Sequence, residues 1–266
     1  MSIMRKILLF GTKERKSDLR SHWNIGFITF FLSIIVLAPA SLLTPVLTAA
    51  GLEYRALQGR IWSGHVLGLS IRDVYAGDLE FRFGPLSLVT GKIGYYVEAK
   101  GGAGVGDGTV SLGIAGLRIN DVNARFDLSS IKQYSMFGLA YDGSVQADVE
   151  VLEWTRKGCM TAAGTISTNA FSNAMKRFSG EDVEFIGTLE CQGNDLALKL
   201  DGQNSKGSAT IAVKVTPNLT YVLNAIVQPK EEVIVQRLKT IGFDFAANNE
   251  RSLVFDARGP IRGLGS

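Results

Sequence analysis

The chain has 266 residues, 46% of them hydrophobic and 20% charged, a globular composition that is long enough for one well-packed domain. The formal net charge is only +3, and the first 22 residues hold six basic side chains against two acidic ones, so the rest of the chain is close to neutral. This distribution argues against a nucleic-acid partner, because such proteins gather Lys and Arg on the domain that binds.

An uncharged stretch follows this basic tail. No charged residue occurs from Trp23 to Leu52, and IGFITFFLSIIVLAPASLL supplies about 19 mostly apolar residues, enough to cross a ~30 Å hydrocarbon core as a helix. Basic residues precede the stretch and the acidic Glu53 follows it, so the positive-inside rule predicts a cytoplasmic N-terminus. We therefore expect a cytoplasmic tail over residues 1–22, a single transmembrane anchor over 23–50 and a periplasmic-type domain over 51–266.

The alternative to an anchor is a cleaved signal peptide. Ala38, Pro39 and Ala40 have the small-x-small form that signal peptidase accepts. Against cleavage, the leading region is longer than usual for a signal peptide and apolar sequence continues past Ala40. An uncleaved anchor, in contact with membrane lipid, is the preferred interpretation.

Beyond the anchor the dominant hydrophobic period is two. Alternation over residues 78–83, 109–114, 144–151 and 252–261 predicts half-buried strands. Asp-Gly pairs at 107–108, 142–143 and 201–202 predict type I′ hairpin turns. The pattern predicts a mainly β fold, a single antiparallel β-rich domain built as a curved sheet or a sandwich. One or two short helices are expected, over residues 172–178 and 229–241, the second ending at Gly242.

Two cysteines, Cys159 and Cys191, lie in the exported part. In an oxidising compartment an even number of cysteines predicts a disulfide. A bridge here closes a loop of about 33 residues and stabilises the fold by roughly 3 to 4 kcal/mol on the loop-entropy model. Two buried thiols are the alternative, while a zinc site lacks nearby histidines.

The sequence offers little for catalysis. The two histidines, His22 and His65, have no recognisable nucleophile motif beside them. The run GGAGVGDGT lacks the third glycine of a dinucleotide loop, and GPLSLVTGKI misses the phosphate-loop spacing. Acidic pairs such as Asp182 with Glu184, or Asp195 with Glu190, are typical of a solvated strand face. We expect no catalytic residue, cofactor, metal or small-molecule substrate.

Two short motifs carry a family resemblance. LQGRIWSGHV contributes Gly59, Trp62 and Gly64 and is similar to the Gly-x-Leu-Trp-x-Gly signature of the type II secretion system protein N family, with Ile61 in place of Leu. The later segment LEFRFGPLSLVTGKI resembles the next family element, through Phe81, Pro85, Leu88 and Gly91. The two cysteine segments and the single predicted anchor fit the same family.

Physically, Trp62 between two glycines predicts a large apolar side chain packed on the core as the chain enters its first strand. The other interpretation is that Trp62 and the motif residues form a contact surface for another membrane component. The sequence leaves both open.

The resemblance implies a non-enzymatic inner-membrane component of the type II secretion apparatus, which moves folded periplasmic proteins across the outer membrane. Its partners are then other inner-membrane or periplasmic secretion proteins, and its role is assembly or scaffolding. The alternative is an AsmA-like envelope protein with a lipid-binding β groove. Strand alternation alone does not separate a closed core from a lipid-lined one.

Overall fold

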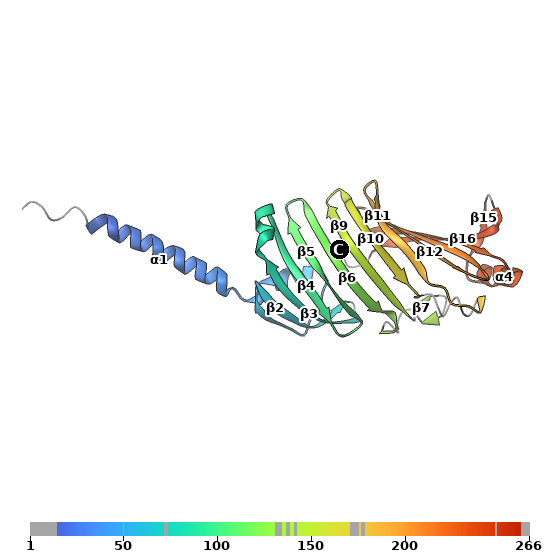
Figure 1. Ribbon diagram of the computed structural model, residues 1–266, viewed down its shortest axis with the longest axis horizontal. Coiled ribbons are helices and arrows are strands. Elements are labelled where there is room, and N and C mark those ends of the chain that lie inside the picture. Colours follow the sequence, from blue (N-terminus) through green and yellow to red (C-terminus); the bar gives the residue numbers. More distant parts are fainter. Residues whose placement is uncertain are drawn as a thin grey trace, which may run out of the picture.

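The computed structural model describes residues 15–49, 51–71, 74–130, 135–136, 139–140, 143–170, 176, 179–247 and 249–261. The expected mainly β, antiparallel architecture is confirmed, as one 14-stranded sheet rather than a sandwich. Strands that follow one another in the chain mostly pair as neighbours, with β6 beside β9 and β14 beside β16. Figure 1 shows a long, twisted and curved sheet, with helix α1 projecting from one end and α4 and β15 at the other.

The strands of the large sheet are β1 (Ala56–Arg60), β2 (Ser63–Ile71), β3 (Val74–Gly84), β4 (Lys92–Lys100), β5 (Gly104–Gly113), β6 (Gly116–Asp127), β9 (Ser144–Thr155), β10 (Gly158–Thr168), β11 (Phe185–Gln192), β12 (Asp195–Asn204), β13 (Gly207–Val215), β14 (Thr220–Pro229), β15 (Asp244–Ala246) and β16 (Asn249–Pro260). A separate small hairpin pairs β7 (Ser135–Met136) with β8 (Leu139–Ala140). The helices are α1 (Arg15–Leu37), η1 (Ala40–Leu43), α2 (Thr44–Ala49), η2 (Pro85–Thr90), η3 (Leu128–Ser130) and α4 (Glu232–Thr240), where η marks a 3₁₀ helix.

The four alternating segments lie in strands, as the period of two predicts. They fall in β3, β5, β9 and β16, and each strand extends beyond the segment that signalled it. Burial along β9 alternates between half-buried and exposed residues. Alternation therefore located these strands, but not their full length.

The Asp-Gly turns were wrong at two of three positions. Asp107 and Gly108 lie inside β5, at a shift in its register with β6, and Asp201 and Gly202 lie inside β12. Gly202 is required by packing, since an added Cβ would lie 2.8 Å from the Phe185 ring. Asp142 of the third pair is outside the described residues.

The expected C-terminal helix exists with a later start. Pro229 ends strand β14, and α4 begins three residues later at Glu232. Proline fits this strand end because it has no N–H to contribute to a ladder. Gly242 follows the helix with φ of +98°, a conformation that favours glycine. The helix expected over residues 172–178 falls mostly outside the described residues.

The uncharged N-terminal stretch is not one continuous helix. Helix α1 ends at Leu37, two residues before Pro39, which restricts the residue ahead of it. Beyond this break, η1 and α2 pack on the sheet. No helix among the described residues is long and apolar enough to cross a membrane.

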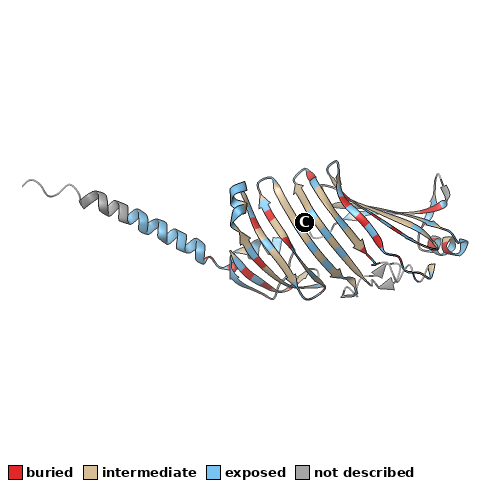
Figure 2. Ribbon diagram, in the orientation of Figure 1, coloured by how far each residue is buried: buried red, intermediate tan, exposed pale blue. Residues whose placement is uncertain are grey.

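The hydrophobic core is divided between the two ends of the sheet. One cluster surrounds Val66 and Phe81 near α1, and two others surround Phe185 and Leu253 near α4. Among the described residues none of these clusters includes a side chain of β5, β6 or β9. Figure 2 shows the same division, with half-buried and exposed residues across the middle strands.

Candidate functional site

Trp62 joins helix α1 to the sheet. It lies in the two-residue turn between β1 and β2, not in the first strand as expected, and its side chain is half-buried. Its indole Nε1 donates a hydrogen bond to the Ile35 carbonyl oxygen in the last turn of α1, at 2.9 Å. The ring packs edge-on against Phe83, with centroids 4.8 Å apart. One side chain thus contacts the helix and the third strand together.

The chain between α1 and β1 is also held against the sheet. Ile61 donates its N–H to the Ala38 carbonyl oxygen at 3.0 Å, and Pro39 forms an isolated β-bridge with Arg60. Ala40 is only 1% exposed and packs in the cluster that contains Val66. Helix α1 therefore leaves the sheet at a fixed point.

The two glycines beside Trp62 allow this turn to close. Gly59 pairs with Gly64 across the hairpin and has φ of +101°. A Cβ on Gly64 would lie 2.3 Å from the Gln58 carbonyl oxygen and 2.8 Å from the Phe81 ring. The signature therefore places a tryptophan on a hairpin too tight for any other residue at its glycine positions.

The second motif builds the neighbouring turn. Phe81 pairs with Gly64, is buried, and meets Tyr95 edge-on with centroids 5.9 Å apart. Pro85 begins η2, where its missing N–H costs nothing. Gly91 ends η2 in the left-handed conformation, with φ of +69°. The structure thus brings these motif residues, with Leu88 in η2, to one corner of the sheet near the end of α1.

A large apolar hollow lies over the middle strands. Its volume is about 440 Å³, and β3, β4, β5, β6 and β9 supply its lining. The lining is mainly aliphatic and includes Ala99, Val110, Ile119, Val122, Ala124 and Leu152. All six of these side chains are half-buried, because the core clusters lie to either side of them.

The opposite face of the same strands carries charge. Arg82 donates to Glu80 at 2.5 Å, and Lys100 lies 2.9 Å from Glu98. The hydrogen bond from Arg82 lowers the pKa of the half-buried Glu80 carboxyl below its usual value. Lys92 and Arg118 both approach Glu153. This is a solvated face stabilised by weak exposed ion pairs.

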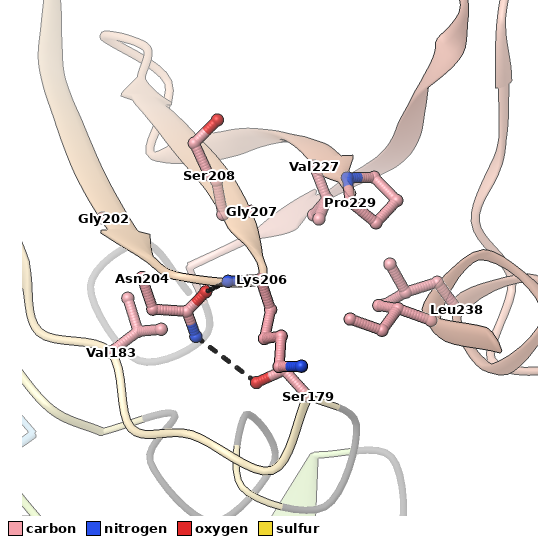
Figure 3. Close-up of a pocket in the computed structure, with 12 residues that line it drawn as sticks. Ser179, Val183, Gly202, Asn204, Lys206, Gly207, Ser208, Val227, Pro229 and Leu238 are labelled. Carbon is pink, nitrogen blue, oxygen red and sulfur yellow. Dashed lines mark hydrogen bonds between the residues drawn. The ribbon is translucent and has the colours of Figure 1, made fainter. Parts of the chain in front are cut away.

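A second cavity, between α4 and the β12–β13 turn, is too small for a ligand. Figure 3 shows Asn204 pointing toward Ser179, and its Nδ2 donates to the serine Oγ at 3.4 Å, while Leu238 faces the gap from α4. The volume is about 40 Å³. This space has room for water, but it is far below the roughly 300 Å³ of a small-molecule site.

The cysteine pair forms the predicted disulfide. Cys159 at the start of β10 is bonded to Cys191 near the end of β11, with Cα atoms 5.7 Å apart. Cys159 is 1% exposed and donates its backbone N–H to Asn194 at 2.8 Å. The bridge therefore links the neighbouring strands β10 and β11 covalently. The alternative of two buried thiols is wrong.

The remaining candidates do not assemble into a reactive site. His65 is exposed on β2, and Glu190 accepts a hydrogen bond from Gln192 on its own strand. Lys176 lies 3.4 Å from Asp182. Within the described ranges no three His, Cys, Asp or Glu side chains gather as metal ligands.

The sequence interpretation missed the hollow and the acceptor for Trp62. The apolar alternation of β4, β5, β6 and β9 was visible, but whether a second layer covers that face is not a local property. The Ile35 carbonyl oxygen lies in the last turn of α1, where Pro39 has no N–H to donate to it; it accepts from Ala38 N–H at 3.3 Å and from Trp62. Pro39 was the only sequence signal of this helix end.

Comparison with known proteins gives one relationship. No curated protein and no solved structure matches the chain. The family model for the type II secretion system (T2SS), protein N, matches residues 50–247, which is more than half of the chain. Because this match covers more than half of the chain, the chain belongs to the type II secretion system protein N family.

Proposed function

We propose that this type II secretion component is held in the inner membrane by α1, with its N-terminus in the cytoplasm and its sheet in the periplasm. Its role is assembly or scaffolding through contacts with other secretion proteins, and the proposal assigns it no catalytic step. The observation that carries the proposal is the joint at Trp62, since the bond to Ile35 holds a large sheet at the end of an apolar helix.

The apolar surface of α1 supports the proposal that this helix anchors the protein in the membrane. The large apolar side chains of residues 23–37 are exposed, including Trp23 at 74% and Phe27 at 61%. At 1.5 Å per residue this uncharged part is about 22 Å long, shorter than a ~30 Å hydrocarbon core. Local thinning of the bilayer and long basic side chains at the flank accommodate such a mismatch.

Apolar side chains beside the joint support a position close to the membrane. Helix η2 follows β3 directly and exposes Leu86 at 82% and Val89 at 85%. Phe83, just before η2, donates its N–H to the Trp62 carbonyl oxygen at 2.7 Å. This exposed turn therefore lies next to the point where α1 leaves the sheet.

Two further contacts support an uncleaved, exported chain. Signal peptidase cleavage after Ala40 would remove a residue that is almost fully buried in the cluster beneath α1. The Cys159–Cys191 bridge persists in an oxidising compartment such as the periplasm.

The test is a deletion strain, complemented with the full chain or left without it. Secreted proteins are measured in the medium and in the periplasm, together with permeability of the outer membrane to a large antibiotic. We expect secreted proteins to accumulate in the periplasm behind an intact envelope. Normal secretion from the deletion strain would refute the proposal.

A lipid-handling role in the envelope is the second candidate, and the open apolar hollow favours it. In the same strain it predicts a permeable outer membrane with normal secretion. The two functions therefore predict opposite results for both secretion and outer-membrane permeability in the same culture.

A further inference from the structure

The apolar face of the sheet is continuous from strand to strand. In the register of the ladders, Leu79, Ala99, Gly106, Ala124 and Ala147 follow one another across β3, β4, β5, β6 and β9. Residues two positions along each strand form parallel apolar rows, because side chains alternate between faces. Glu80, Glu98 and Glu153 lie on the other face, whereas Asp107 and Arg125 are among the residues that line the hollow.

Short side chains hollow out the middle of this face. Gly106 of β5 lies between Ala99 of β4 and Ala124 of β6, so the centre of the row is low. Gly108 pairs with Val97 of β4 and extends the low region along β5. Longer side chains such as Leu152 line the hollow farther along. The result is a depression of about 440 Å³, within the size range of small-molecule sites of roughly 300–1,000 Å³.

The two ends of the face are closed by the chain itself. Near α1, Ala40 of η1 and Leu47 of α2 pack on it, and near the C-terminus Ile234 and Leu238 of α4 do so. Between these covers, the described residues place no element over β5, β6 and β9. The hollow is thus a bounded segment of an otherwise covered face.

The chemistry of the lining selects the occupant. A peptide strand binds a sheet at an edge, whereas each strand around the hollow already pairs on both sides and has no free ladder groups. A two-turn helix of about 10 Å diameter occupies roughly 850 Å³, so the hollow can take only part of it. A hydrocarbon chain fits an aliphatic lining and needs no hydrogen bonds.

We propose that the hollow over β3, β4, β5, β6 and β9 binds an acyl chain of a membrane glycerophospholipid. The source is the membrane in which the proposed function places α1, and to that extent the inference rests on that function. The lipid headgroup stays in solvent at the open side of the hollow, where Asp107 and Arg125 are the charged residues among those that line it.

Neighbouring residues of β6 supply a matched pair for the test. Val122 lines the hollow, whereas Asn123 is exposed on the opposite face. A photocrosslinking residue, benzoylphenylalanine, replaces each in turn in the full chain, in cells that carry the secretion system. After irradiation the protein is purified and its intact mass is measured. We expect an adduct of glycerophospholipid mass at position 122, several-fold more abundant than at position 123.

A second pair of variants tests the surface itself. Ala124→Glu places a carboxylate in the hollow, and Asn123→Glu places the same group on the polar face. With the crosslinker at Leu152, we expect Ala124→Glu to reduce the phospholipid adduct by about tenfold and Asn123→Glu to leave it unchanged, since an apolar site disfavours a buried charge.

Equal labelling at positions 122 and 123, or an adduct with a protein or with lipid A, would overturn the inference. The deletion strain keeps the two proposals distinguishable. A secretion defect without a phospholipid adduct refutes lipid binding in the hollow but leaves the secretion role standing. An adduct with normal secretion refutes the secretion role but leaves lipid binding standing.

Discussion

Trp62 stabilises the joint through two separable contacts. Trp62→Phe keeps a ring against Phe83 but removes the hydrogen bond to Ile35, and we expect it to lower the free energy of unfolding by about 1 kcal/mol. Trp62→Ala removes both contacts and is expected to lower it by about 2 kcal/mol. This is below the ~3 to 5 kcal/mol typical of a fully buried tryptophan, because the ring is half-buried.

Urea unfolding of the detergent-solubilised full chain, followed by near-ultraviolet circular dichroism, measures these changes. Tyr96→Ala, which removes an exposed ring and its 3.3 Å hydrogen bond to Asp107, is the control and is expected to cost less than Trp62→Ala. A Trp62→Ala loss no larger than that of Tyr96→Ala would contradict the role of the joint. Unchanged stability with lost secretion would instead favour Trp62 as a partner contact.

Gly64 is required by space alone. Gly64→Ala forces a methyl group against Gln58 and Phe81, and we expect a loss of about 1 to 3 kcal/mol from overpacking. Gly84→Ala is the matched control, since its Cβ would meet only the Gly94 carbonyl oxygen at 3.7 Å. The melting temperatures of the two variants are compared. Equal melting temperatures would show that the hairpin accommodates a methyl group at position 64 and would contradict the prediction.

At the scale of elements, the disulfide ties β10 to β11. Replacing both Cys159 and Cys191 by Ala is expected to destabilise the protein by about 3 to 4 kcal/mol, because the sulfurs join residues 32 apart in sequence. Urea midpoints of this variant and of the native protein with and without reductant measure the effect. A midpoint that neither reduction nor substitution moves would contradict it.

The two edge strands of the large sheet are short. The two outermost strands, β1 and β15, are among the shortest in the large sheet, at 5 and 3 residues. Short edges limit pairing with another chain. Contacts that this protein makes with secretion partners are therefore expected on the motif corner or on a sheet face, rather than by addition of a strand.

At the scale of the whole molecule, the proposed orientation is directly testable. Alkaline phosphatase, which is active only after export, is fused after Ser266 or after His22. We expect activity from the Ser266 fusion and none from the His22 fusion, because α1 is proposed to cross the membrane once. Activity from both fusions, or from neither, would contradict a single-pass anchor with a cytoplasmic N-terminus.

Local patterns were enough to predict much of this protein. The period of two identified β3, β5, β9 and β16, and the pairing of Cys159 with Cys191 followed from number and compartment. These features depend on a residue and its near neighbours in sequence, which is why they can be recognised without a structure.

Other features were decided only in three dimensions. Asp201 and Gly202 lie in a strand, because Gly202 leaves room for Phe185 on the neighbouring strand. Pro229 ends a strand because β14 pairs with β13 up to that residue. Both outcomes depend on a partner strand that the local sequence does not name.

The sequence by itself determined that the chain has an uncharged N-terminal stretch followed by strands with one apolar and one polar face. Only the tertiary structure decided that these strands form one sheet, that α1 stops at Leu37, and that the apolar face is covered at its ends and open over β5, β6 and β9 among the described residues. The physical reason is that alternation records which side of a strand avoids water, while what lies on that side is set by segments distant in the chain.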